Sequence, residues 1–162
     1  MKISDSMVSA INDQIKAEYD SAYIYLAMSA YFKDAGLDGM AHWMQKQYRE
    51  EVEHAEKFIN YLYDRGARVI IPDVAKPKDN YTDALEVFKT AYAHEQYVTS
   101  RIYALVDLAI SEKDYATQSM LKWFVDEQVE EEDNTSGIVS KLEFLGTDKH
   151  GLYAVDRELL AR

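Results

Sequence analysis

The chain has 162 residues, of which 48% are apolar, and this size and composition suit one folded domain predicted to span residues 1–162. It contains no cysteine, which excludes disulfides, thiolate zinc sites and iron–sulfur clusters. A net charge of −11 disfavours nucleic acid and anionic membranes as partners; the surplus acid either keeps the surface soluble or attracts cations.

No secretory signal and no apolar run of about 18 residues is visible in the sequence. We therefore expect a soluble, cytoplasmic protein with no membrane partner. Apolar residues instead recur at helical spacing through several long segments, which predicts an all-α fold. The predicted helices cover, in chain order, residues 5–33, 38–65, 82–110, 114–144 and a short final stretch, 153–160.

Glycines mark the predicted ends of three of these helices. Gly36, Gly66 and Gly146 each follow the last residues of a helical pattern, and glycine readily takes the left-handed conformation that closes a helix. Asp38 is predicted to be the N-cap of the second helix, because a short acidic side chain can accept a hydrogen bond from the first turn.

The segment from residue 66 to residue 80 holds both prolines, Pro72 and Pro77, and lacks helical periodicity. Helices of about 28 residues are roughly 42 Å long, and fifteen extended residues can reach up to roughly 50 Å. The segment can therefore run the length of a helical bundle. This predicts two helical hairpins joined by one long crossover, which is the connectivity of ferritin-like four-helix bundles.

Both predicted hairpins carry the same arrangement of ligand-type side chains. In each, a lone glutamate is followed 33 residues later by two ligand-type residues at positions i and i+3, which share one helix face. The six residues are Glu18, Glu51, His54, Glu95, Gln128 and Glu131.

All six residues fall on apolar stripes of their helices. A lone buried carboxylate would cost several kcal/mol unless it were protonated, paired or bound to a cation, and no run of lysines or arginines shares these faces. Any single acid could still belong to a solvated face, but four carboxylates with a histidine and an amide on four helices favour a metal site. Carboxylates with one imidazole and no thiolate favour ferrous iron or manganese.

Two adjacent cations would account for the number of acids. In this hypothesis Glu51 bridges both ions, and Glu18 and His54 complete the first site. The second site contains Glu95, with Gln128 and Glu131 nearby. Because a neutral amide is a weak ligand, one side of the centre would release ferric product, so iron fits better as a substrate than as a permanent cofactor.

These motifs together resemble the bacterial non-haem ferritins along essentially the full chain. The resemblance rests on the six residues above, on Tyr25 seven positions after Glu18, and on Trp123. It implies a ferroxidase that oxidises Fe(II) with dioxygen or peroxide, stores a hydrated ferric mineral, and assembles into a hollow shell of 24 identical subunits.

The resemblance also implies roles for further residues. Glu50, Glu127 and Glu130 resemble the ligands of a third iron site, although inner-surface charge explains them nearly as well. Tyr25 would act beside the centre as an electron donor or hydrogen-bond partner, whereas Trp123 is expected to pack in the core. The other histidines are expected to be surface or packing residues: His42, His94 and His150.

Several alternatives differ from this interpretation in specific residues. Haem-binding bacterioferritins carry a methionine where this chain has Val52, so no haem is expected. Rubrerythrin-type peroxidases need a cysteine-ligated iron domain, and the small DNA-protecting relatives place their ligands differently. A non-storage di-iron oxidase or peroxidase and a metal-free helical assembly protein remain as alternatives.

Overall fold

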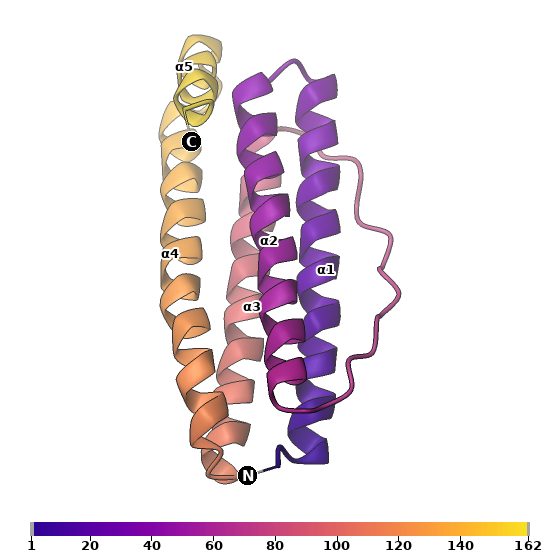
Figure 1. The fold of residues 1–162 in the computed structure, drawn as a ribbon. Helices are drawn as coiled ribbons and strands as arrows, with labels where there is room; N and C mark the ends of the chain where they lie inside the picture. The colour runs from indigo at the N-terminus through magenta and orange to yellow at the C-terminus, as the bar shows by residue number, and fades with distance from the viewer. Residues whose placement is uncertain (1, 162) are drawn as a thin grey trace.

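The computed structural model describes residues 2–161, which form five α-helices and no β-strand (Figure 1). The all-α, ferritin-like four-helix architecture predicted from the sequence is confirmed. Residues 1 and 162 of the predicted domain lie outside the described residues. The helices are α1 (Asp5–Asp34), α2 (Asp38–Asp64), α3 (Ala84–Ser111), α4 (Tyr115–Leu145) and α5 (Lys149–Leu159).

The predicted glycine ends of the helices are confirmed, and two predicted helix starts need correction. Gly36, Gly66 and Gly146 all have positive φ angles, of 74°, 65° and 57°. Asp38 is not the N-cap of α2 but its first helical residue, where its negative charge still favours the positive end of the helix dipole. The last helix begins at Lys149, four residues before the predicted start, because the preceding Asp148 side chain accepts a hydrogen bond from a backbone N–H of the first turn.

The predicted long crossover is also confirmed. In Figure 1 the chain leaves the end of α2, climbs along α1 to the opposite end of the bundle, and there enters α3. It is fastened to α1 by side chains of that helix. Asn12 donates to the carbonyl of Arg68 at 3.1 Å and accepts from the N–H of Ile70 at 2.7 Å, and Asp20 accepts from the N–H of Ala75 at 2.8 Å.

The short helix α5 packs against the start of α2 and the end of α4. The backbone of α5 comes very near α2 at Gly39, where an added Cβ would lie 1.6 Å from the carbonyl oxygen of Asp156. The carboxylate of Asp156 accepts a hydrogen bond from the N–H of Met40 at 2.8 Å. Only glycine allows this contact, which closes one end of the bundle.

The interior consists of two apolar clusters. One, toward α5, contains aromatic residues such as Phe32, Trp43 and Phe88; the other, toward the opposite end, includes Phe58 and Phe124. Along each of the four long helices, the buried polar residues of the predicted site lie between the segments that contribute to these clusters. Among residues 2–161, no helix is long and apolar enough to cross a membrane.

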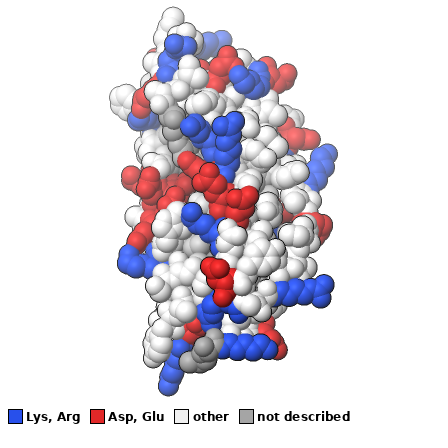
Figure 2. Space-filling view, in the orientation of Figure 1, with Lys and Arg blue, Asp and Glu red and all other residues white. Residues whose placement is uncertain are grey.

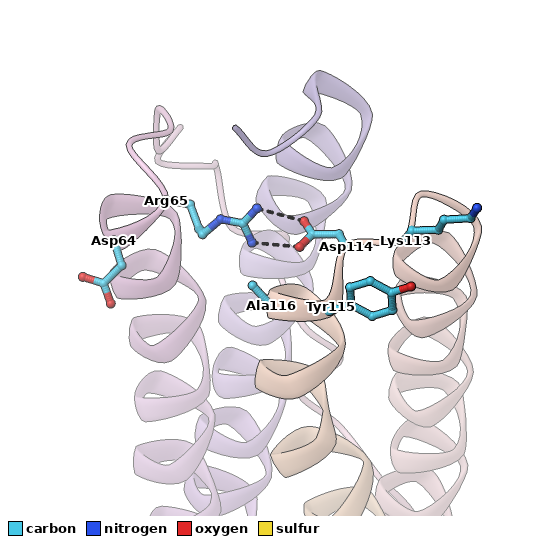
Figure 3. Close-up of a pocket in the computed structure, with 6 residues that line it drawn as sticks. All are labelled: Asp64, Arg65, Lys113, Asp114, Tyr115 and Ala116. Carbon is cyan, nitrogen blue, oxygen red and sulfur yellow. Dashed lines mark hydrogen bonds and ion pairs between the residues drawn. The ribbon is translucent and has the colours of Figure 1, made fainter. Parts of the chain in front are cut away.

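A bidentate ion pair joins α2 to α4 at the end of the bundle away from α5 (Figure 3). Arg65 donates to both carboxylate oxygens of Asp114, at 3.1 and 3.0 Å, and both side chains are largely buried. Asp114 is also the N-cap of α4 and accepts from the N–H of Thr117 at 3.2 Å. Burial raises the pKa of Asp114, but the hydrogen bonds from Arg65 and Thr117 outweigh it, so this pKa is lowered overall.

We predict that Arg65→Met lowers the free energy of unfolding by about 2–3 kcal/mol at neutral pH, because Asp114 would remain partly buried without its charged donor. A carboxylate with a lowered pKa stabilises the fold above its unfolded-state pKa, and this stability is lost as the pH falls through the folded-state pKa. The difference between the two proteins in denaturant titrations should therefore shrink below about pH 4.

The matched control is Lys122→Met, which breaks the exposed pair of Lys122 with Asp126 and should change stability by less than about 0.5 kcal/mol. Equal effects of the two substitutions would contradict a structural role for the Arg65–Asp114 pair.

Candidate metal centre

The structure brings the six predicted ligand residues into one buried layer at mid-bundle. They come from all four long helices, and none is more than 4% exposed. Glu18, Glu51 and His54 each offer one ligand atom, and these three atoms lie within 4.8 Å of one another. Within this set, His54 Nδ1 lies 3.4 Å from Glu51 Oε2.

The other side of the layer is built around Glu95. The hydroxyl of Tyr25, which is fully buried, donates to Glu95 Oε1. The amide of Gln128 donates to Glu95 Oε2 at 3.2 Å. Both carboxylate oxygens of Glu95 are thus held by neutral donors, so its position is fixed without a counter-charge.

Glu131 lies near His54 and Glu127, a grouping that the sequence analysis did not predict. Its carboxylate, His54 and Glu127 offer ligand atoms within 4.8 Å of one another, and it also raises the pKa of Glu51 by charge repulsion. Glu131 therefore faces both the Glu51 side of the centre and the half-buried Glu127.

Burial shifts the acid–base chemistry of the centre strongly. It is the largest cause that raises the pKa of Glu18 to about 7 and the pKa of Glu51 well above its usual range, where nearby glutamates add to the effect. Burial also raises the pKa of Glu95 against the hydrogen bonds from Tyr25 and Gln128. In the apo protein these carboxyl groups hold protons that water-exposed glutamates would release.

The pKa of His54 is shifted in the opposite direction, which makes this residue a candidate ligand. Burial, with a smaller contribution from Lys57, lowers its pKa to about 4. At neutral pH the imidazole is therefore uncharged, and its approach to Glu51 is no ion pair. A neutral imidazole has a lone pair that can bind a metal.

The donor set fits a hard divalent cation. Among the described residues, Glu18 Oε2 is buried and accepts no hydrogen bond from an N–H or hydroxyl donor. The Glu18 carboxyl instead faces that of Glu51, and two facing carboxyl groups are costly unless a cation or a shared proton lies between them. Carboxylates with one neutral imidazole are ligands that suit ferrous iron and manganese.

The three remaining predicted ligands form a more open acidic group beside the buried layer. Burial, followed by repulsion from Glu130 and Glu50, raises the pKa of Glu127. Glu50 and Glu130 line a surface cavity of 580 Å³. Figure 2 shows acidic side chains gathered at mid-height over α2 and α4. His54 Nε2 lies 3.9 Å from Glu127 Oε1 and so connects this group to the buried layer.

Comparisons with known proteins identify the family of this chain. Residues 8–145 match the model of the ferritin-like domain. The chain is 41% identical over 160 residues to the bacterial non-heme ferritin of Staphylococcus aureus (strain USA300), which covers 99% of this chain and 96% of that protein. The chain belongs to the ferritin family.

Solved structures place this ferritin close to archaeal relatives. It superposes with a TM-score of 0.99 on a protein described as an open pore ferritin from Archaeoglobus fulgidus, with 45% sequence identity and 99% of each chain covered. A protein described as a humanized archaeal ferritin gives a TM-score of 0.98 at 45% identity, with 99% of this chain and 98% of that chain covered.

Two buried amides of this ferritin's centre were not predicted. Gln14 donates to Glu18 Oε1 at 2.8 Å, and Gln47 donates to Glu131 Oε2 at 2.7 Å. Gln14 lies one helical turn before Glu18 on the same buried stripe, and Gln47 has the same relation to Glu51. This i, i+4 spacing is the sequence signal that could have revealed them.

The aromatic and histidine residues near the centre divide into confirmed and corrected predictions. Trp123 is 40% exposed and not a core residue: its ring meets the His54 ring edge-on at 5.4 Å, with Lys57 over its face at 4.5 Å. His94 is half-buried and shares a 2.7 Å hydrogen bond with Ser21, as expected of a packing residue. The other two histidines are half-buried and exposed respectively: His42 and His150.

We predict that Glu18→Gln stabilises the metal-free protein above neutral pH. The folded-state pKa of Glu18 is about 7, whereas its ordinary value is 4.5. The stability associated with the bound proton is therefore fully present below about pH 4.5 and is lost as the pH rises through about 7. In denaturant titrations at about pH 8, without metal, the variant should be about 1–3 kcal/mol more stable than the parent.

The exposed Glu143, changed to Gln, serves as the control and should leave the pH profile unchanged. A Glu18→Gln variant that is less stable than the parent at about pH 8 would show that the apo protein tolerates this carboxylate without penalty.

Proposed function

We propose that this ferritin stores and detoxifies iron by binding Fe(II) at a dinuclear ferroxidase centre within each subunit. The observation that carries the proposal is the buried convergence of Glu18, Glu51 and His54, with Glu95 in the same layer. The centre oxidises Fe(II) to Fe(III), and the chain stores the product as a ferric mineral inside a hollow homo-oligomer, a 24-subunit cage. The whole process takes place in the cytoplasm.

In this proposal, binding of Fe(II) displaces protons from the carboxyl groups of the metal-free centre. When Fe(II) enters, Glu18 and Glu51 give up the protons that burial makes them hold, and the neutral His54 contributes its lone pair. Glu51 bridges the two ions in this proposal, and Glu95, Gln128 and Glu131 complete the second side. Each Fe(II) loses one electron, and dioxygen or peroxide accepts the electrons of the pair.

Tyr25 is the residue proposed to assist this electron transfer. Burial, together with the nearby charge of Glu95, raises the pKa of Tyr25 well above its usual value. The phenol therefore stays protonated and keeps its hydrogen bond to Glu95. It can hold this ligand in place, or donate an electron from a site in direct contact with it.

Glu50, Glu127 and Glu130 are proposed as a third iron site that receives the ferric product. Two features support this assignment: the mutual repulsion of the three carboxylates and the 3.9 Å approach of Glu127 to His54. The weak amide ligand Gln128 would ease departure of Fe(III) from the dinuclear centre. No haem is part of the proposal, because Val52 stands where a haem-ligating methionine would be needed.

Aerobic addition of excess Fe(II) followed by size-exclusion chromatography tests storage. Ferric absorbance should travel with a very large protein assembly, at far more than two irons per chain. Iron limited to about two per chain on a small species would indicate a non-storage di-iron oxidase instead. Precipitation at the rate seen without protein would indicate a metal-free assembly protein.

The double variant Glu18→Ala, His54→Ala should assemble normally but oxidise Fe(II) at least about 100-fold more slowly, because the first ion loses two of its ligands. The rate of ferric absorbance after mixing with Fe(II) measures this. The matched control replaces an exposed glutamate and histidine, Glu143→Ala with His150→Ala, and should retain the parental rate. Normal oxidation by the site variant would overturn the site assignment.

A further inference from the structure

A hydrogen-bonded chain of three side chains links Glu18 to the outer surface of the bundle. Gln14, which is 1% exposed, donates through Nε2 to Glu18 Oε1 at 2.8 Å. The other end of the same amide, Oε1, accepts from Arg101 Nε at 2.9 Å. Arg101 is on α3 and Gln14 is on α1, so these hydrogen bonds connect the two helices.

Arg101 is itself held in a fixed position. Its guanidinium donates to the backbone carbonyl of Asp13 at 3.1 Å and to the hydroxyl of Tyr97 at 3.3 Å. Both Arg101 and Gln14 line a surface cavity of 290 Å³ between α1 and α3.

The hydrogen-bond donors and acceptors of Arg101, Gln14 and Glu18 allow only one arrangement. A guanidinium can donate but cannot accept, so it must face the oxygen of the Gln14 amide. The nitrogen of that amide is then directed at Glu18. One carboxylate oxygen of Glu18 is thereby occupied. Among the described residues the other, Oε2, is buried and accepts no hydrogen bond from an N–H or hydroxyl donor, and the Glu18 carboxyl faces that of Glu51.

We propose that Arg101 is a positioning residue for the metal centre, acting through Gln14 to hold Glu18 with Oε2 presented to the cation. This inference rests on the proposed function, since it takes Glu18 to be a metal ligand. Residues that orient ligands in this way typically change metal affinity by about 10–100-fold when they are replaced.

Anaerobic titration with Co(II) tests the proposal without any oxidation chemistry. Binding affinity and the visible absorption spectrum of the bound Co(II) are measured for the parent, Arg101→Met, Gln14→Met and the double variant. Arg101→Met should weaken Co(II) binding at the centre at least about tenfold and alter the spectrum. Arg101→Lys, which keeps the charge but has no guanidinium fork, should recover only part of the affinity.

The double variant separates positioning from simple stabilisation. If Arg101 acts through Gln14, adding Arg101→Met to Gln14→Met should produce no further loss of affinity. Arg65→Met is the matched control, because it also removes an arginine that joins two helices, but this arginine lies at the C-terminal end of α2, at one end of the bundle. It should lower stability while leaving Co(II) affinity and spectrum unchanged.

Four outcomes overturn the inference. Parental Co(II) affinity and spectrum in Arg101→Met would refute it and leave the proposed function intact. Additive losses in the double variant would show that Arg101 acts independently of Gln14. An equal loss in Arg65→Met would show that Arg101 acts through general stability. Absence of Co(II) binding by the parent protein would instead refute the proposed function together with this inference.

Discussion

Burial of several carboxyl groups at one level of a helical bundle is the constraint on which the rest of this structure depends. Glu18, Glu51 and Glu95 lie between two apolar clusters, where the charged form of each is disfavoured by loss of water. Protons can satisfy these groups in the apo state, but only a cation satisfies several of them together. The apolar clusters on either side stabilise the fold, so the layer between them can hold buried carboxyl groups that no positive charge in the described part of the chain neutralises. Such locally unfavourable groups are common at functional sites.

The surrounding structure keeps this layer in place. The crossover is fastened along α1 by Asn12 and Asp20, and the Arg65–Asp114 pair joins α2 to α4 at one end. Neutral donors hold individual oxygens within the layer, as Tyr25 does for Glu95. Neutral donors fix geometry without cancelling the charge that a cation must meet, so the site is rigid and still attractive to metal.

Much of this arrangement could be predicted from the sequence because it repeats. Glu18 and Glu95 are related by 77 positions, as are Glu51 and Gln128, and helical spacing alone put these residues on buried faces. The same 77-residue offset explains why Gln14 and Gln47 were not predicted. Gln14 and Gln47 correspond to Ala91 and Phe124, so neither amide belongs to the repeat.

Other features depend on contacts that no repeat or periodicity encodes. The start of α5 is set by the Asp148 cap, and the exposure of Trp123 follows from its position beside the buried stripe that carries Phe124. The link from Arg101 to Gln14 joins residues far apart in the sequence, so only the packing of α3 on α1 reveals it.

The most direct test of the account is the number of protons released when the metal-free protein binds Fe(II) anaerobically at about neutral pH, followed in a weakly buffered indicator solution. Buried carboxyl groups that hold protons until a cation replaces them predict tight binding of about two Fe(II) per chain with release of at least one proton per chain. The Glu18→Gln variant should release fewer protons. Tight binding without proton release, or no tight binding at all, would contradict the account.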